Sequence, residues 1–94
     1  MMEHRVEQIR FEVLNEAMNN TFNELLAAKA YGRIPKENDA EYEKLLSELR
    51  NFRDSAFEEE ETDPIRLDLL QEKVLDYRER VRSILKEKTK EEAI

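Results

Sequence analysis

Apolar residues recur at helical spacing along the second half of the chain. Between residues 39 and 59 they fall three and four positions apart, the spacing of one face of an α-helix, at Tyr42, Leu45, Leu49, Phe52 and Ala56. Between residues 64 and 88 they form an unbroken heptad seam at Leu67, Leu70, Val74, Tyr77, Val81 and Ile84, with Leu85 alongside and Lys88 closing it. Two such seams joined by a short link predict an antiparallel helical hairpin of the coiled-coil kind.

The first predicted helix, residues 3–31, differs because it carries two apolar stripes. One stripe consists of Val6, Ile9, Val13 and Ala17, and the other, about 100° round the helix, of Phe11, Leu14, Met18, Phe22 and Leu25. Such a helix needs two neighbours, or one neighbour and a second copy of the protein; alternatively, the stripes merge into one broad core face. We expect this helix to lie in the groove of the hairpin, giving a three-helix antiparallel bundle that dimerises.

The residues between these segments predict where the helices end and begin. Gly32 suits the left-handed position that commonly follows a helix. Asn38 with Glu41 reads as a capping box that starts the second helix near residue 39. Asp63 followed by Pro64 reads as the cap and first position of the third helix. The tail, residues 89–94, is charged and lacks an apolar seam, so we expect it to fray.

The composition supports an all-α fold in a single domain, residues 1–94. One glycine and two prolines leave little for the tight turns of a sheet, and 41% of the residues are charged against 39% hydrophobic. The absence of cysteine excludes disulfides and thiolate sites and favours a cytoplasmic location. The start MMEHRVEQIRFE is charged and no run approaches 18 apolar residues, so we expect neither an export signal nor a membrane span.

The net charge of −7 bears on the class of partner. Nucleic acids and anionic lipids are bound through Lys and Arg, so an acidic chain repels both. Proteins with a basic surface are the partners that this charge favours. The one histidine, His4, has no second histidine or cysteine with which to form a transition-metal site, and we expect no cofactor.

The run Glu58 to Glu61, followed by Asp63, concentrates negative charge between the last two helices. Acids at a helix C-terminus oppose the helix dipole, and acids before an N-terminus complement it, so the run suits a solvated joint. A second interpretation is an acidic mimic of nucleic acid that blocks a basic DNA-binding protein. Because Lys44, Arg50 and Arg66 interrupt the acids, only the local cluster has that character.

A third interpretation is enzymatic. Glu59, Glu60 and Asp63, with Glu72 and Asp76 on the next helix, resemble the carboxylate motif of the all-α nucleotide pyrophosphohydrolases of the MazG kind. That resemblance implies Mg²⁺ held between helices and an attack on nucleotide phosphates. It covers about a fifth of the chain, and the later acids are four positions apart where the family has them three apart.

The end of the third helix is basic, at Arg78, Arg80, Arg82, Lys86, Lys88 and Lys90. In an antiparallel dimer across third helices, the acidic start of one copy would meet the basic end of the other; alternatively, the mixed charge is a solvated face. The connector after the first helix places Tyr31 and Arg33 together, which suits a protein contact; alternatively, and more commonly for a short helix connection, it is a cap on the end of the bundle.

The sequence therefore predicts a small, non-catalytic protein-interaction or regulatory module whose size suggests a bacterial or phage origin. It would bind helix-in-groove or helix-on-helix through the uncovered stripe of the first helix. The candidate interaction residues are Val6, Ile9, Val13, Tyr31, Arg33, Glu59, Glu60, Arg78 and Arg82.

Overall fold

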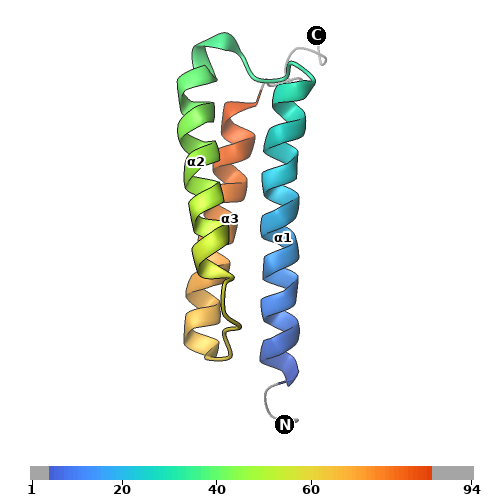
Figure 1. Ribbon diagram of the computed structural model, residues 1–94, viewed down its shortest axis with the longest axis vertical. Coiled ribbons are helices and arrows are strands. Elements are labelled where there is room, and N and C mark those ends of the chain that lie inside the picture. Colours follow the sequence, from blue (N-terminus) through green and yellow to red (C-terminus); the bar gives the residue numbers. More distant parts are fainter. Residues whose placement is uncertain (1–4, 86–94) are drawn as a thin grey trace.

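Three α-helices make up almost all of the described chain. The computed structural model describes residues 5–85, in which the order is α1 (Arg5–Ala30), a 3-10 turn η2 (Lys36–Asn38), α2 (Asp39–Ala56) and α3 (Pro64–Ile84). No strand occurs in that range, so the all-α prediction is confirmed. Figure 1 shows the three helices side by side, with the chain passing from one end of the molecule to the other three times.

Side-chain contacts fix which parts of the helices lie level with one another. Near one end, the ring centroids of Phe11 on α1 and Phe57 after α2 are 5.4 Å apart. Near the other end, Lys29 Nζ lies 3.0 Å from Asp39 Oδ1 at the start of α2. Since Arg10 at the start of α1 pairs with Asp68 at the start of α3, α1 and α3 point the same way and α2 the opposite way (Figure 1).

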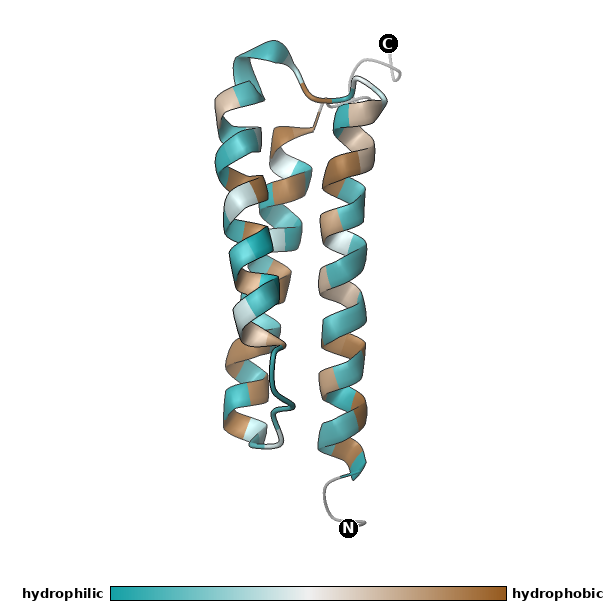
Figure 2. Cartoon of the chain, viewed as in Figure 1, coloured by the Kyte–Doolittle hydropathy of each residue, from teal (hydrophilic) through white to brown (hydrophobic). Residues whose placement is uncertain are grey.

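The core lies along the axis where the three helices meet. Most buried apolar side chains come at the predicted spacing on each helix. In Figure 2 the hydrophobic residues of each helix, buried and exposed alike, appear as brown bands separated by teal ones. The buried apolar residues are Phe11, Leu14, Met18, Phe22, Leu25, Ala28, Ile34, Tyr42, Leu45, Leu49, Leu67, Val74, Val81, Ile84 and Leu85. Burial of such side chains provides about 1.5–3 kcal/mol each relative to exposure, and it is the main force that holds the helices together.

Two of the predicted helix boundaries have the expected chemistry. Gly32 has φ of 69°, the left-handed conformation that L-residues with a Cβ rarely adopt. Asp63 caps α3: its Oδ1 accepts a hydrogen bond from the Ile65 N–H at 3.0 Å, and Pro64 follows it within the first turn.

The capping box predicted at Asn38 is wrong. Asn38 precedes α2, but its side chain makes no cap hydrogen bond. Instead its Nδ2 donates to the carbonyl of Ile84 at 3.0 Å, so it satisfies an acceptor at the end of α3. The sequence signal for a cap is local, and this partner lies 46 residues away.

All three helices end earlier than predicted, α1 by a single residue, at Ala30. α2 ends at Ala56 rather than residue 59, because Phe57 leaves the helix to pack against Phe11 and Phe52 and the acids that follow are unfavourable at a helix C-terminus. α3 ends at Ile84 rather than residue 88, because Leu85 adopts an extended conformation and is buried. The predicted fraying of residues 89–94, the start of α1 at residue 3 and the seam position Lys88 lie outside the described residues.

Candidate interaction surface

The two apolar stripes of α1 lie in different environments. The stripe that contains Phe11 and Met18 is buried in the bundle. Residues of the other stripe are largely exposed, with Val6 at 65%, Ile9 at 50% and Val13 at 60%. Isolated exposed apolar residues are ordinary, but three at the spacing of one helix face form an unpartnered stripe.

A groove runs beside this stripe, between α1 and α3. It has a volume of about 360 Å³ and is lined by Ile9, Arg10, Val13, Leu14, Ala17, Gln71, Val74, Leu75 and Arg78. Buried Leu14 and Val74 lie at its base, whereas the exposed side chains of Val13 and Leu75 flank it from opposite helices. No residue of α2 lines the groove, so it is a feature of the parallel pair α1 and α3 alone.

One arginine bridges the two helices beside the groove. Arg10 Nη2 on α1 donates to Asp68 Oδ1 at 2.8 Å and to Gln71 Oε1 at 3.2 Å, both on α3. These hydrogen bonds align the start of α1 with the acidic start of α3 along the bundle axis. Since Asp68 remains largely exposed, the pair contributes little to stability by itself.

The groove becomes polar toward the later half of α3. A second hollow of about 190 Å³ is lined there by Ala17, Asn20, Thr21, Glu24, Arg78 and Arg82. The buried hydroxyl of Thr21 is satisfied, because it donates to the Ala17 carbonyl at 2.9 Å. Within residues 5–85 no carboxylate lies within 4.0 Å of Arg78 or Arg82, so both guanidinium groups are free of ion pairs in that range.

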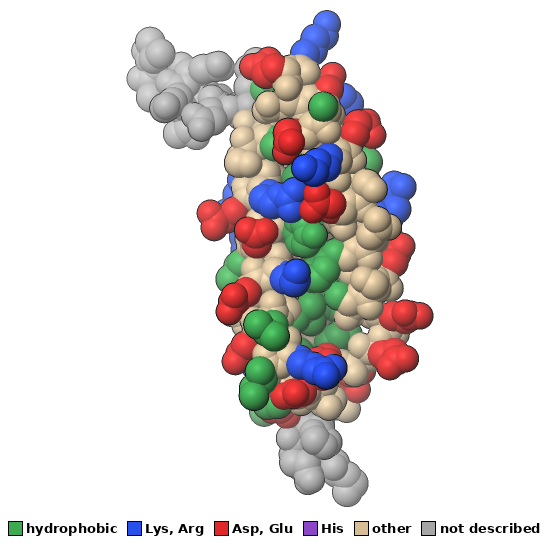
Figure 3. Space-filling view, turned by 90° about the vertical axis from the view of Figure 1, so that its left-hand side faces the viewer, with side chains coloured by type: hydrophobic (Ala, Val, Ile, Leu, Met, Phe, Trp, Pro, Cys, Tyr) green, Lys and Arg blue, Asp and Glu red, His purple; other side chains and the backbone are tan. Residues whose placement is uncertain are grey.

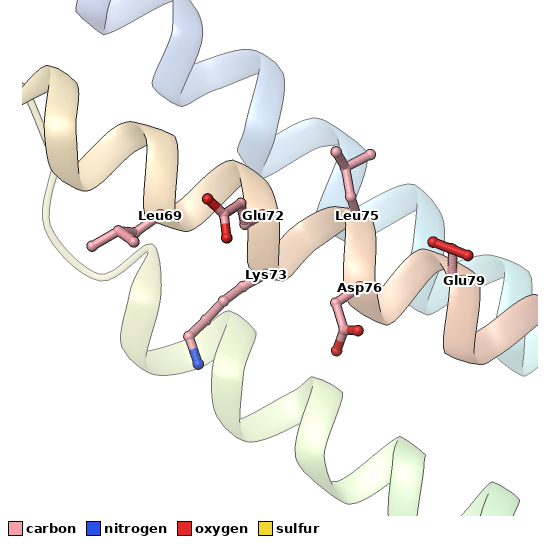
Figure 4. Close-up of a pocket in the computed structure, with 6 residues that line it drawn as sticks. All are labelled: Leu69, Glu72, Lys73, Leu75, Asp76 and Glu79. Atoms are coloured by element: carbon pink, nitrogen blue, oxygen red, sulfur yellow. The ribbon is translucent and has the colours of Figure 1, made fainter.

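The outer face of α3 carries an acidic row. Figure 4 shows Leu69, Glu72, Lys73, Leu75, Asp76 and Glu79 projecting from successive turns of this one helix, where they line a shallow depression. Among the described residues, no three histidine or acidic side chains are grouped so as to hold a metal ion. The carboxylates that resemble a pyrophosphohydrolase motif are not brought together.

The acids of the link have local partners. Glu61 Oε2 accepts a hydrogen bond from the Asp63 N–H at 3.0 Å, and Arg66 lies within 4.0 Å of both carboxylates. Glu59 and Glu60 are exposed. In Figure 3, blue basic side chains lie among the red acidic ones on the face that contains α2, so this face is not a continuous row of negative charge.

The connector after α1 is divided between the core and the surface. Ile34 is buried, whereas Tyr31 is 81% exposed. Arg33 is half-buried, and its Nε has no hydrogen-bond partner within the described part of the chain. Ile34 thus caps the bundle, while Tyr31 points to solvent and lies far along α1 from the stripe that begins at Val6.

Sequence reasoning missed the strongest polar contact between α2 and α3. Arg80 Nη1 and Nη2 donate to the two carboxylate oxygens of Glu48 at 3.0 and 3.2 Å. These hydrogen bonds and the arginine charge hold the pKa of Glu48 below its ordinary value, while burial, with help from Glu48, raises the pKa of the neighbouring Tyr77. The sequence pattern places Arg80 in the basic end of the third helix, and nothing local to it indicates a partner 32 residues earlier.

A search of protein-family models, of curated proteins and of solved structures found no match to this chain. No helix within residues 5–85 is both long enough and apolar enough to cross a membrane.

Proposed function

We propose that this chain is a protein-interaction module that binds another helix along the α1–α3 groove. The observation that carries the proposal is the exposed stripe of Val6, Ile9 and Val13 beside a groove with a buried apolar base. Amphipathic helices bind such grooves by laying residues at spacings of three and four into them. The dimer predicted from the sequence belongs to this proposal, because a second copy also offers exposed helical residues.

The chemistry of the groove supports a helix as the bound group. Its apolar part lies between two parallel helices, so a third helix can pack there as a ridge into a groove at an interaxial distance of about 8–10 Å. Arg10, Gln71 and Arg78 border the apolar part and can bind polar side chains of the bound helix. A surface with an apolar centre and a polar rim is the usual anatomy of a specific protein interface.

Affinity capture from cells with matched baits tests the proposal. The groove variant carries Ile9→Asn and Val13→Asn, and the control carries Leu26→Asn, which alters an exposed apolar residue of α1 that does not line the groove. We expect the wild type and the control to capture the same proteins and the groove variant to lose one or more of them. Identical sets of captured proteins for all three baits would contradict the proposal.

A stability measurement must accompany the capture. The substituted side chains are exposed, and Asn and Val have similar helix propensities, so the variants should unfold within about 1 kcal/mol of the wild type. A loss of captured proteins with an unchanged unfolding curve then reports binding rather than folding.

A further inference from the structure

The face formed by α1 and α3 changes along its length from acidic, through apolar, to basic. At the start of α3 it is acidic, with Asp63 and Asp68 following the acidic link. In the middle it is apolar, where Val13 and Leu75 flank the groove. In the later half it is basic, with Arg78 and Arg82 free of carboxylate partners within residues 5–85.

Three residues of α3 show this change from acidic to apolar to basic most clearly. Asp68, Leu75 and Arg82 are seven residues apart, and seven residues make two turns of helix within about 20°, so they lie in one row. All three side chains are exposed. The row therefore presents an acid, an apolar residue and a base at equal intervals of about 10 Å.

We propose that a second copy of this chain binds this face, with its α3 antiparallel to the first α3 and the two Leu75 side chains on the two-fold axis. This inference rests on the proposed function and names the partner. Antiparallel pairing about Leu75 places Asp68 of each copy opposite Arg82 of the other, so the symmetric interface contains the ion pair twice. The neighbouring row places Gln71 opposite Arg78, where the amide oxygen can accept from the guanidinium.

The groups needed for this pairing are available. Within residues 5–85, Asp68 uses only Oδ1, for Arg10, and its side chain is 68% exposed. Val13 and Ala17 of α1 line the same groove as Leu75, so they extend the apolar centre toward the second copy. The charge complementarity of the two ends selects the antiparallel over the parallel orientation, because a parallel pair would place like charges opposite each other.

The same register has one unfavourable feature. Glu72 and Glu79 lie on the outer side of the row, and antiparallel pairing brings Glu72 of one copy toward Glu79 of the other. This repulsion weakens the pair, so Glu79→Lys is expected to strengthen it by converting two repulsive contacts into two attractive ones. A variant that gains affinity cannot be explained by a failure to fold.

Sedimentation equilibrium on the full chain tests the proposal with charge-exchange variants. Arg82→Glu gives the row an acid at both ends, and Asp68→Arg gives it a base at both ends. Each variant alone should dimerise about tenfold or more weakly than the wild type, whereas an equimolar mixture should form the heterodimer. Arg50→Glu changes the net charge equally on α2, which does not line the groove, and should leave the dimer constant within about twofold.

The charge-exchange variants test the proposed ion pairs more directly than the dependence of dimerisation on salt concentration does. Each copy carries a net charge of −7, so salt screens the overall repulsion between copies as well as the local ion pairs. The two effects have opposite signs, and only the exchange variants separate them.

Several outcomes would overturn the inference. The inference fails if the wild type is monomeric at about 0.5 mM, or if Arg82→Glu and Arg50→Glu have equal dimer constants. It also fails if the mixture of Arg82→Glu and Asp68→Arg forms no heterodimer, or if Glu79→Lys does not dimerise more tightly than the wild type. A monomeric wild type whose groove variant still loses captured proteins would overturn the second copy as partner and leave the proposed function intact. A wild-type dimer whose dimer constant and set of captured proteins are both unchanged in the groove variant would overturn the inference and the proposed function together.

Discussion

Arg80 and Glu48 join α3 to α2 through a bidentate ion pair, in which Arg80 Nη1 donates to Glu48 Oε1 and Arg80 Nη2 donates to Glu48 Oε2. This geometry is stronger than a single contact, because the planar donor and the planar acceptor match. Glu48 lies at the middle of α2 and Arg80 near the end of α3, where the Arg80 guanidinium carbon is 5.3 Å from the centroid of the Tyr77 ring.

The ion pair predicts a specific pH dependence. Because the pKa of Glu48 is lower in the folded chain than its ordinary value of 4.5, the pair stabilises the fold above that pH, and this contribution is lost as pH falls through the folded pKa. We expect Glu48→Gln to cost about 0.5–1 kcal/mol at pH 7, since the side chains are about one-third exposed.

Urea unfolding of wild type and Glu48→Gln at pH 7 and pH 3 measures this effect. The cost of the substitution should shrink at pH 3, where the wild-type carboxyl is increasingly protonated. Glu43→Gln, on the exposed face of α2, is the matched control for the general effect of removing an acid. A cost that is equal at both pH values would show that the ion pair is not responsible.

Asn38 gives a prediction that separates capping from a tertiary contact. Asp and Asn are equally good N-cap residues, so capping alone predicts that Asn38→Asp is neutral. In the structure Asn38 donates to the Ile84 carbonyl, and Asp would replace the donor with a negative charge beside the C-terminal end of α3. We expect Asn38→Asp to lower the free energy of unfolding by about 1–2 kcal/mol, and more than Asn38→Ala. Equal stability of wild type and Asn38→Asp in urea would contradict this contact.

Two leucines of α3 provide a matched test of the core. Leu67 is completely buried, whereas Leu69, two residues later, is 57% exposed. We expect Leu67→Ala to cost about 2–5 kcal/mol, through lost burial and the cavity left behind, and Leu69→Ala to cost no more than about 0.5 kcal/mol. Thermal unfolding followed by circular dichroism measures both, and comparable costs would mean that α3 is rotated about its axis.

Gly32 tests the end of α1. Its φ of 69° is strained for a residue with a Cβ, although an added Cβ would meet no atom within 4 Å. The expected cost of Gly32→Ala is therefore backbone strain alone, about 1 kcal/mol. Gly32→Asn should cost less, because asparagine tolerates this conformation better. If the two variants were equally stable, the turn would have to adopt another conformation.

The sequence predicted those parts of the fold that depend on local spacing. The seam from Leu67 to Ile84 identified the buried face of α3, and Asp63 with Pro64 identified its first turn, because both signals lie within a few residues of each other. The same reasoning separated the two stripes of α1 and expected the stripe of Val6, Ile9 and Val13 to stay uncovered, and these three side chains are exposed.

Contacts between distant segments were not predictable in this way. Arg80 with Glu48, Asn38 with Ile84, and Arg10 with Asp68 each join residues that are 32 to 58 positions apart. A polar residue on a helix carries no mark of which partner it will meet, since an exposed position and an inter-helix position suit the same side chains. The groove is likewise a property of two helices together, although exposed Leu75 lay outside the predicted seam and was a signal that α3 has a second apolar position.

Because the number of helices is odd, the first helix begins and the last helix ends at opposite ends of the bundle. With three passes, the chain enters at one end of the bundle, at Arg5, and the last helix finishes at the other end, at Ile84 (Figure 1). A domain or label joined before α1 and another joined after α3 would be held apart by about the length of a 20- to 26-residue helix, some 30–40 Å. This fold can therefore serve as a rigid spacer, a property that a two- or four-helix bundle, with both ends at one pole, does not have.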